Sequence, residues 1–252
     1  MTTAAPAARL RVVDATRRPE RALKVDLPFA DRVEAGRLLG AELASRRLSL
    51  NRVVLALPRG GVPVGFEVAK ALYCPFDVVI VRKLGVPWQK ELAMGAIAGD
   101  GARILDHDLI RTMEIPQDAI DAVLERERKE LARRERLYHG GSAPAAIKAE
   151  ALRGMDVVLV DDGIATGSTM IAAARHVTSQ RPRRLIIAAP VAAYDSGQRL
   201  LAEADECVFL ALPSPFYAVG EWYRDFRQIE DEEVLEILAV AAKTLPTTPS
   251  GT

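Results

Sequence analysis

Two adjacent carboxylates followed by glycine, threonine and serine stand out in residues 157–174, VVLVDDGIATGSTMIAAA. Asp161 and Asp162 come directly after an aliphatic run that is typical of a buried strand. Carboxylates placed there can accept hydrogen bonds from two vicinal hydroxyl groups or help to hold a hydrated Mg²⁺ ion. Gly163 and Gly167 then permit a sharp turn and a close approach of the backbone to a ligand.

The turn after the carboxylates has the features of an anion site. A helix is expected to follow it, and the unpaired N–H groups and the dipole at a helix start favour a phosphate group. The residues predicted to bind this phosphate are Ala165, Thr166, Gly167, Ser168 and Thr169. With Asp161 and Asp162 about one ribose away, the segment predicts a ribose 5-phosphate site.

The sequence of this segment excludes two known phosphate-binding motifs and matches a third. The chain contains no GxxxxGK[ST], and no GxGxxG follows a predicted strand. Residues 157–169 instead resemble the phosphoribosyl-pyrophosphate (PRPP) signature of the type I phosphoribosyltransferase family: aliphatic residues, two acidic residues, a spacer and T-G-[ST]. The resemblance implies a Mg²⁺-dependent transfer of the ribosyl 5-phosphate group from PRPP to a nitrogen acceptor, with release of pyrophosphate.

The same resemblance implies an α/β, Rossmann-like type I phosphoribosyltransferase fold, in which helices flank a central, mostly parallel sheet and a small hood is added. Independently, short β-branched runs alternate with helical patterns, which indicates a parallel α/β sheet. We expect strands over residues 52–57, 77–81, 102–105, 156–160, 184–191 and 207–212. We expect helices over residues 31–47, 63–72, 117–138, 168–180, 195–203 and 230–243.

A second segment, LPRGGVPVGFEVAKAL (57–72), is similar to the pyrophosphate loop of that family. Arg59, Gly60 and Gly61 match the loop. Glycines let backbone amides face a diphosphate, and an arginine offers a fork of donors to a group with many charged oxygens. The alternative is a plain turn that leads into a helix.

Two further basic residues, Arg82 and Lys83, are expected at the carboxyl end of the next parallel strand, where open α/β sheets bind ligands. This is where the family places basic residues that meet PRPP; the alternative is a solvated charge pair. The candidate catalytic residues are therefore Asp161, Asp162, Arg59, Arg82 and Lys83. Mg²⁺ would be held through water by Asp161 and Asp162.

The acceptor is less well indicated than the donor. Some purine-salvage members carry an aspartate directly before T-G, where this chain has Ala165, so a 6-oxopurine handled by that aspartate is not supported. A hood over the acceptor is expected from residues 22–32 and 213–229. Its candidates for stacking on a planar base are Phe216, Tyr217, Trp222 and Tyr223. A small satellite core is the alternative role of these aromatic residues.

Charge and composition limit the possible partners. The 252 residues include 34 Lys and Arg against 34 Asp and Glu, so no global basic field indicates nucleic-acid binding. No apolar run approaches the roughly 18 residues of a membrane span. Two cysteines without metal-ligand spacing indicate a reducing, cytoplasmic compartment. We expect a phosphoribosyltransferase-like domain over residues 22–245, with flexible tails at 1–21 and 246–252.

The predicted helix at 117–138 carries the charge-dense run ERERKELARRER. Its interspersed charges indicate a solvated helix that lies on the sheet or bridges subunits, since no aromatic residues interleave them as in nucleic-acid binders. Relatives in the family commonly form homodimers or higher homo-oligomers. The alternative to an enzyme is a non-catalytic regulator of the same fold that binds PRPP or a nucleotide.

Overall fold

The computed structural model describes residues 26–99, 101, 103–140, 147 and 149–247. Its strands are β1 (Arg52–Ala56), β2 (Phe76–Val78), β3 (Val81–Val86), β4 (Gln89–Ala98), β5 (Arg103–Leu105), β6 (Asp156–Val160), β7 (Arg184–Val191) and β8 (Glu206–Ala211). Its α-helices are α1 (Arg32–Ala44), α2 (Gly61–Leu72), α3 (His107–Thr112), α4 (Gln117–His139), α5 (Ser168–Ser179), α6 (Tyr194–Leu200) and α7 (Asp231–Thr244). Short 3-10 helices cover Ala149–Leu152 and Val219–Trp222.

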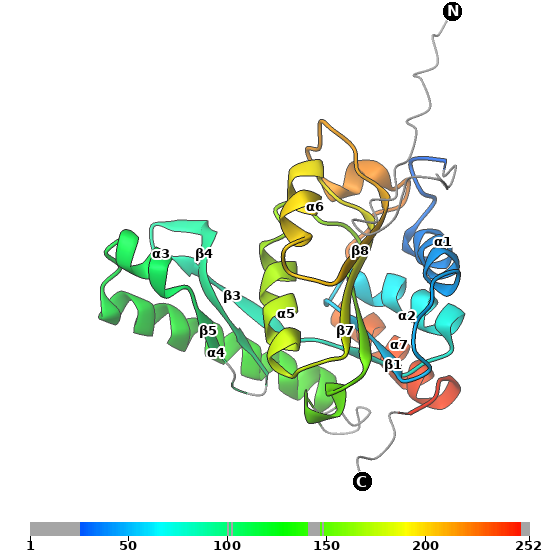
Figure 1. The fold of residues 1–252 in the computed structure, drawn as a ribbon, viewed down its shortest axis with the longest axis horizontal. Coiled ribbons are helices and arrows are strands. Elements are labelled where there is room, and N and C mark those ends of the chain that lie inside the picture. Colours follow the sequence, from blue (N-terminus) through cyan, green and yellow to red (C-terminus); the bar gives the residue numbers. More distant parts are fainter. Residues whose placement is uncertain (1–25, 100, 102, 141–146, 148, 248–252) are drawn as a thin grey trace, which may run out of the picture.

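Five parallel strands form the central sheet in the order β2-β1-β6-β7-β8 (Figure 1). Neighbouring strands run in register, so that Ala56 at the end of β1 lies opposite Val160 at the end of β6. Because parallel strands end at the same edge, the loop after β1 and the signature turn after β6 emerge side by side. The sheet therefore brings together two segments that are about 100 residues apart in the chain.

Both faces of this sheet are covered by helices. Val157 and Leu159 of β6 pack in the core on the side of α5 and α6, whereas Val158 and Val160 pack with α1 and α2. All four side chains are fully buried. Strands that are buried on both faces need apolar side chains at every position, which is why β6 shows no alternation with polar residues.

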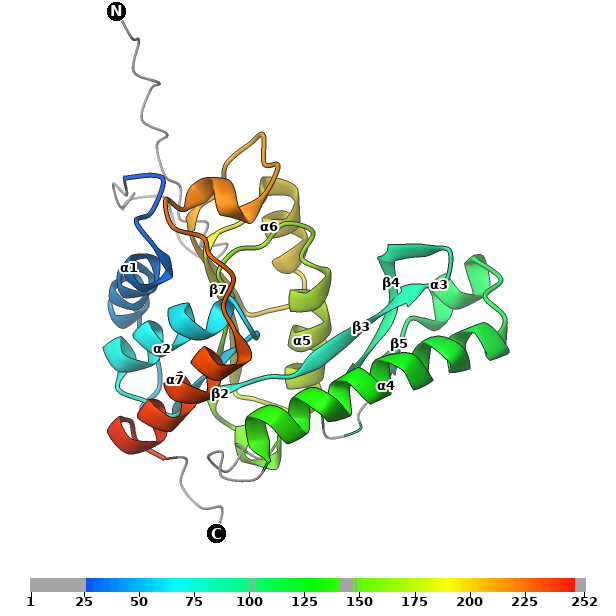
Figure 2. The same ribbon diagram turned by 180° about the vertical axis from the view of Figure 1, so that it is seen from behind.

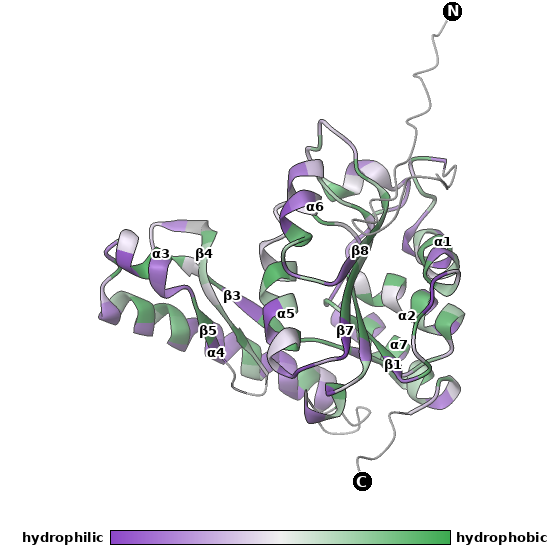
Figure 3. Ribbon diagram, in the orientation of Figure 1, coloured by the Kyte–Doolittle hydropathy of each residue, from purple (hydrophilic) through white to green (hydrophobic). Residues whose placement is uncertain are grey.

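A second unit extends away from the central sheet as an arm, made of β3, β4, β5, α3 and α4 (Figures 1 and 2). Its three strands form an antiparallel sheet in the order β3-β4-β5, so β3 is an edge strand. Helix α4 alternates hydrophobic and hydrophilic residues (Figure 3) and packs its apolar side against this sheet. The arm is anchored at its base, where Val81 and Ala96 share a core with Met170 of α5.

The arm is where the sequence-based element predictions are wrong. Residues 77–81 were expected to form one strand, but β2 ends at Val78 and β3 begins at Val81 in the other sheet. Strand β4 and helix α3 were not expected at all. Gly85 and Pro87 interrupt the run of apolar residues that would indicate a strand near the β3–β4 hairpin. A strand that is covered on one face only can also form with few β-branched residues, so its sequence signal is weak.

Several predictions concern the ends of the chain. The predicted tail 1–21, residues 248–252 of the predicted tail 246–252, and residues 22–25 of the predicted hood lie outside the described residues. The remaining hood segments do meet: Phe29 pairs with Tyr223, and its N–H donates to the carbonyl of Trp222 at 2.9 Å. No helix within the described part of the chain is both long and apolar enough to cross a membrane.

Candidate functional site

The turn between β6 and α5 forms an open cradle at a helix start. Gly167 precedes the first helical residue with φ +74°, a left-handed conformation that favours glycine. Two side chains of α6 secure this turn: the Ser196 hydroxyl donates to the carbonyl of Ala165 at 2.5 Å, and Arg199 Nη2 donates to the carbonyl of Thr166 at 2.8 Å. These bonds use carbonyl oxygens of the turn. Of the N–H groups at the start of α5, that of Ser168 makes a long contact of 3.5 Å with the hydroxyl oxygen of Thr166; the first N–H groups of a helix have no carbonyl partner within it and can bind an anion.

The two signature carboxylates have different surroundings. Asp162 is buried and accepts a hydrogen bond from Arg32 Nε at 2.7 Å, within an ion pair to α1. Its backbone carbonyl accepts a further bond from the hydroxyl of Tyr223 at 2.5 Å. Asp161 is half-buried, and its Oδ1 accepts the N–H of Asp162 at 2.9 Å. Asp162 is thus anchored by an ion pair to α1, whereas Asp161 has no such ion pair with the residues that the structure describes.

The loop after β1 packs directly on these carboxylates. A Cβ atom at Gly60 would lie 2.0 Å from Oδ2 of Asp162, and one at Gly61 would lie 2.8 Å from the carbonyl oxygen of Val160. Only glycine fits at either position without moving its neighbours. Glycine is therefore needed at both positions for a structural reason, because it lets the loop after β1 approach the turn after β6 closely.

Burial, followed by the charge of Asp162, raises the pKa of Asp161 well above its usual range. Burial also raises the pKa of Asp162, although the Arg32 guanidinium opposes this shift. Two carboxylates that share one guanidinium retain a negative charge when both are ionised. A cation or hydroxyl donors bound next to Asp161 would stabilise that charge.

The side chains available as ligands determine whether a magnesium ion fits next to Asp161 and Asp162. Among the described residues, no group of three or more His, Cys, Asp or Glu side chains could hold a metal ion on its own. Mg²⁺ commonly takes one or two carboxylates and completes its shell with water and substrate phosphates. Asp161 fits such a partial site, whereas the carboxylate of Asp162 already binds Arg32.

A cavity of about 390 Å³ lies between the central sheet and the arm. Its lining residues come from the ends of β1 and β2, from β3, from α4 and from the first turn of α5: Leu57, Pro58, Val79, Ile80, Val81, Arg82, Lys83, Gly85, Arg126, Glu127, Arg134 and Thr169. Thr169 connects the cavity to the cradle at the start of α5, and Pro58 connects it to the loop after β1. The cavity therefore joins three of the predicted groups.

Arg82 and Lys83 reach this cavity from an unexpected element. They lie in β3 of the antiparallel arm sheet, so their expected place at the end of a parallel strand is wrong. Both residues still line the cavity, together with Leu57 and Pro58 after β1 and Thr169 in the first turn of α5. Arg82 donates through Nε and Nη2 to Oε2 of Glu127, at 2.9 and 2.7 Å.

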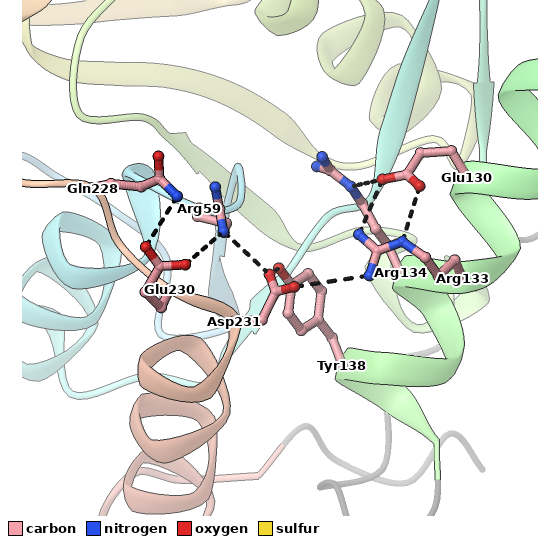
Figure 4. A network of polar contacts seen from close by, with 8 residues as sticks. All are labelled: Arg59, Glu130, Arg133, Arg134, Tyr138, Gln228, Glu230 and Asp231. Carbon is pink, nitrogen blue, oxygen red and sulfur yellow. Dashed lines mark hydrogen bonds and ion pairs between the residues drawn. The ribbon is translucent and has the colours of Figure 1, made fainter.

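Arg59 points elsewhere. Its Nη1 lies 3.3 Å from Oε2 of Glu230 and 3.8 Å from Oδ1 of Asp231, at the start of α7 (Figure 4). It is not among the residues that line the cavity. In this conformation the structure brings Arg82 and Lys83 together with the cradle, while Arg59 ion-pairs with α7.

The aromatic residues of the predicted hood pack mainly on one another. Tyr223 is buried between the rings of Phe29 and Phe226, with centroid distances of 5.5 and 5.1 Å, so neither of its faces is open to a base. Phe216 and Trp222 are half-buried and stack on each other at 6.2 Å. Tyr217 is 80% exposed. The prediction of a stacking role for Tyr223 is therefore corrected: it packs in a satellite core and holds Asp162.

Sequence reasoning missed several side chains of this region. They are Arg32, Arg126, Glu127, Arg134, Ser196 and Arg199. None of them belongs to a motif, and each lies on a helix that reaches the site only after folding. The one sequence signal is the density of charge in residues 125–136, and this pattern predicts a solvated helix face rather than the wall of a cavity.

Comparison with known proteins agrees with these features. The model of a family described as "Phosphoribosyl transferase domain" matches residues 31–216. A Mycobacterium tuberculosis protein, named "Putative phosphoribosyl transferase" in two strains, is 46% identical over 211 residues, 83% of this chain and 46% of that protein. The crystal structure of TT1426 from Thermus thermophilus has a TM-score of 0.73 and 42% identity, covering 84% of this chain and 98% of that one.

The family match includes both the loop after β1 and the signature turn after β6. It also confirms the predicted fold, a mostly parallel central sheet flanked by helices, as that of type I phosphoribosyltransferases. The chain spans about half the length of the curated relatives that it matches. Sequence, fold and comparisons agree that this chain belongs to the phosphoribosyl transferase domain family.

Proposed function

We propose that this protein binds PRPP and transfers its ribosyl 5-phosphate group to a nitrogen acceptor, with release of pyrophosphate. One observation carries the proposal: the cavity of about 390 Å³ connects the phosphate cradle at Thr169 with Pro58 and with the cationic residues Arg82 and Lys83. These are the groups that an extended donor with a phosphate at each end requires. The family relationship supports a transferase of this type.

Each end of PRPP has its own partners in this proposal. The N–H groups at the start of α5 and the hydroxyl groups of Thr166, Ser168 and Thr169 bind the 5-phosphate. Asp161 accepts hydrogen bonds from the ribose hydroxyls, and Arg32 keeps Asp162 in place beside it. The pyrophosphate lies toward Gly60, Gly61 and the cationic wall of β3.

The reaction breaks the bond between ribose C1 and the bridging oxygen, and the electron pair leaves with pyrophosphate. The acceptor nitrogen forms the new bond to C1 and releases its proton. Positive charge develops on the ribosyl ring and negative charge on the leaving group, so catalysis depends on positioning and electrostatics. Arg82 and Lys83 stabilise the leaving group, and the carboxylates favour the cationic ring.

Mg²⁺ fits this site as a partner of Asp161, of water and of the donor's oxygens, and it would supply additional positive charge to the departing pyrophosphate. The Arg59 side chain binds the pyrophosphate once it moves away from Glu230 and Asp231, from which its Nη1 is separated by 3.3 and 3.8 Å.

The exposed ring of Tyr217 is the remaining candidate of the hood for stacking on an acceptor. Both cysteines are free and buried, which supports a reducing, cytoplasmic setting. The proposal also includes a homodimer or higher homo-oligomer, as in the family.

Isothermal titration with PRPP, with and without Mg²⁺, tests the donor site. We expect Mg²⁺-dependent binding by the wild type and binding at least tenfold weaker in Asp161→Asn, since about 1.4 kcal/mol corresponds to a factor of ten. Asp195→Asn is the matched control, because Asp195 is an exposed acid on α6 and its loss changes the net charge equally. Absence of PRPP binding by the wild type would refute the proposal.

A screen for release of pyrophosphate with nitrogen bases and small amines then tests transfer. We expect one class of acceptor to give release that requires Asp161 and Asp162. Tight PRPP binding without release for any acceptor would instead support a regulator that keeps the donor site and lacks catalysis.

A further inference from the structure

Helix α4 contributes side chains to the cavity that no motif assigns. Its apolar residues Ile120, Val123 and Leu131 pack in a core that the arm shares with β1, β2, α2 and α7. Glu127 and Arg134 line the cavity, and their spacing of seven residues places them on one face of the helix, two turns apart. The charge-dense helix is therefore a wall of the cavity as well as a cover for the arm sheet.

The cavity is strongly cationic. Among the described residues that line it, four are basic and Glu127 is the sole acid; the basic residues are Arg82 and Lys83 of β3 and Arg126 and Arg134 of α4. Glu127 is buried and shared, because Arg82 binds its Oε2 while Arg126 Nε donates to its Oε1 at 3.1 Å. Positive charge that gathers around a recess favours an anionic ligand.

Arg134 is held so that its terminal nitrogens remain available. Its Nε donates to Oε1 of Glu130 at 2.9 Å, and no bond of its Nη atoms to the described residues is present. Neighbouring Arg133 binds both oxygens of Glu130, and its Nη1 lies 3.8 Å from Oδ2 of Asp231. Figure 4 shows the two guanidinium groups on different sides of Glu130, with that of Arg133 toward α7.

We propose that Arg134, with Arg126 farther along the same helix, is a further binding residue for the diphosphate end of the donor. The inference rests on the proposed function and extends its leaving-group site from β3 to α4. A diphosphate carries charge on several oxygens and can bind guanidinium groups from two sides. In this arrangement Glu127 is a positioning residue, since it acts through Arg82.

The test compares Arg134→Gln with Arg133→Gln. Both variants remove one charge from the same helix and one partner of Glu130, but only Arg134 lines the cavity. Titrations with Mg²⁺ present use inorganic diphosphate, PRPP and ribose 5-phosphate as ligands. We expect diphosphate and PRPP to bind about tenfold more weakly to Arg134→Gln, because a charge-assisted hydrogen bond is lost.

Ribose 5-phosphate has no diphosphate, so its affinity is expected to be unchanged in both variants. Arg133→Gln is expected to bind every ligand within about twofold of the wild type, since its charge is partly exposed. Arg134→Lys keeps the charge and is expected to recover part of the lost PRPP affinity.

Two results would overturn the inference. One is equal PRPP affinity of the Arg134→Gln and Arg133→Gln variants, which leaves the proposed function intact. The other is an equal loss of ribose 5-phosphate affinity in Arg134→Gln, which indicates a general distortion rather than a lost diphosphate contact. A wild type that binds neither PRPP nor diphosphate would refute the proposed function and this inference together.

Discussion

Replacing Arg32 by methionine tests how the signature carboxylates are held. The side chains of Arg32 and Asp162 are only 9% and 12% exposed, and Arg32 Nε lies 2.7 Å from Oδ2 of Asp162. Loss of one partner from a buried ion pair costs about 3–5 kcal/mol, because the other charge stays buried without compensation. Methionine keeps an apolar stem of similar length, so most of this cost reflects the charge.

A second contact adds to the effect. The Arg32 guanidinium lies 4.0 Å from the centroid of the Phe226 ring, and a desolvated cation–π contact contributes about 0.5–2 kcal/mol. We therefore expect Arg32→Met to lower the free energy of unfolding by about 3–5 kcal/mol, a large part of the roughly 5–15 kcal/mol of a typical domain. The loss should shrink as the pH falls, because burial raises the pKa of Asp162 and protonation removes the unpaired charge.

Urea denaturation followed by circular dichroism measures this change. Arg37→Met on the same helix is the control: the Arg37 side chain is 69% exposed and its Nε lies 3.4 Å from Glu67, so we expect about 0–1 kcal/mol. The double variant Arg32→Met/Asp162→Asn removes both charges and should be more stable than Arg32→Met alone. A loss below about 1 kcal/mol in Arg32→Met, or a double variant less stable than the single one, would refute the reasoning.

Two further substitutions test other contacts of the fold. Gly60→Ala would place a Cβ 2.0 Å from Oδ2 of Asp162, which Arg32 holds in place, so we expect a stability loss of about 1–3 kcal/mol and weaker PRPP binding in titration; unchanged affinity would contradict this. Burial lowers the pKa of His139, but its hydrogen bonds to Asp77 and Glu135 outweigh this and raise it to about 9. Protonated His139 should thus stabilise the fold by about 3 kcal/mol below pH ~6.5, an effect lost as the pH rises through about 9. The stability difference between wild type and His139→Gln should shrink accordingly between pH 6 and pH 10, and a constant difference would count against the assignment.

The central sheet was largely predictable because its evidence is local. Residues 156–160 and 184–191 form strands with the expected bounds, since an apolar run between turn residues is enough to indicate a buried parallel strand. The arm was not predictable to the same degree. Its hairpin contains Gly85 and Pro87, and its strands are covered by α4 only after the chain has returned from residue 117.

The candidate site divides in the same way. The cradle at Thr166–Thr169 and the carboxylates at Asp161 and Asp162 follow one strand without interruption, so their order in the chain already predicts their proximity. The aromatic residues of 213–229 were open to two interpretations. Their packing around Phe29 favours a satellite core for Tyr223 and leaves Tyr217 exposed.

Local residue patterns are enough to predict the family, the strands of the central sheet and a glycine-containing turn before a helix, because each of these depends on residues close together in the chain. Which charges pair depends instead on the packing of distant elements. Arg32 reaches Asp162 across 130 residues, Arg59 turns to Glu230 across 171, and Arg134 reaches the cavity from a helix of the arm. An ion pair forms only where the packing of whole helices brings two charges together, and a local sequence pattern carries no information about the distance between such helices.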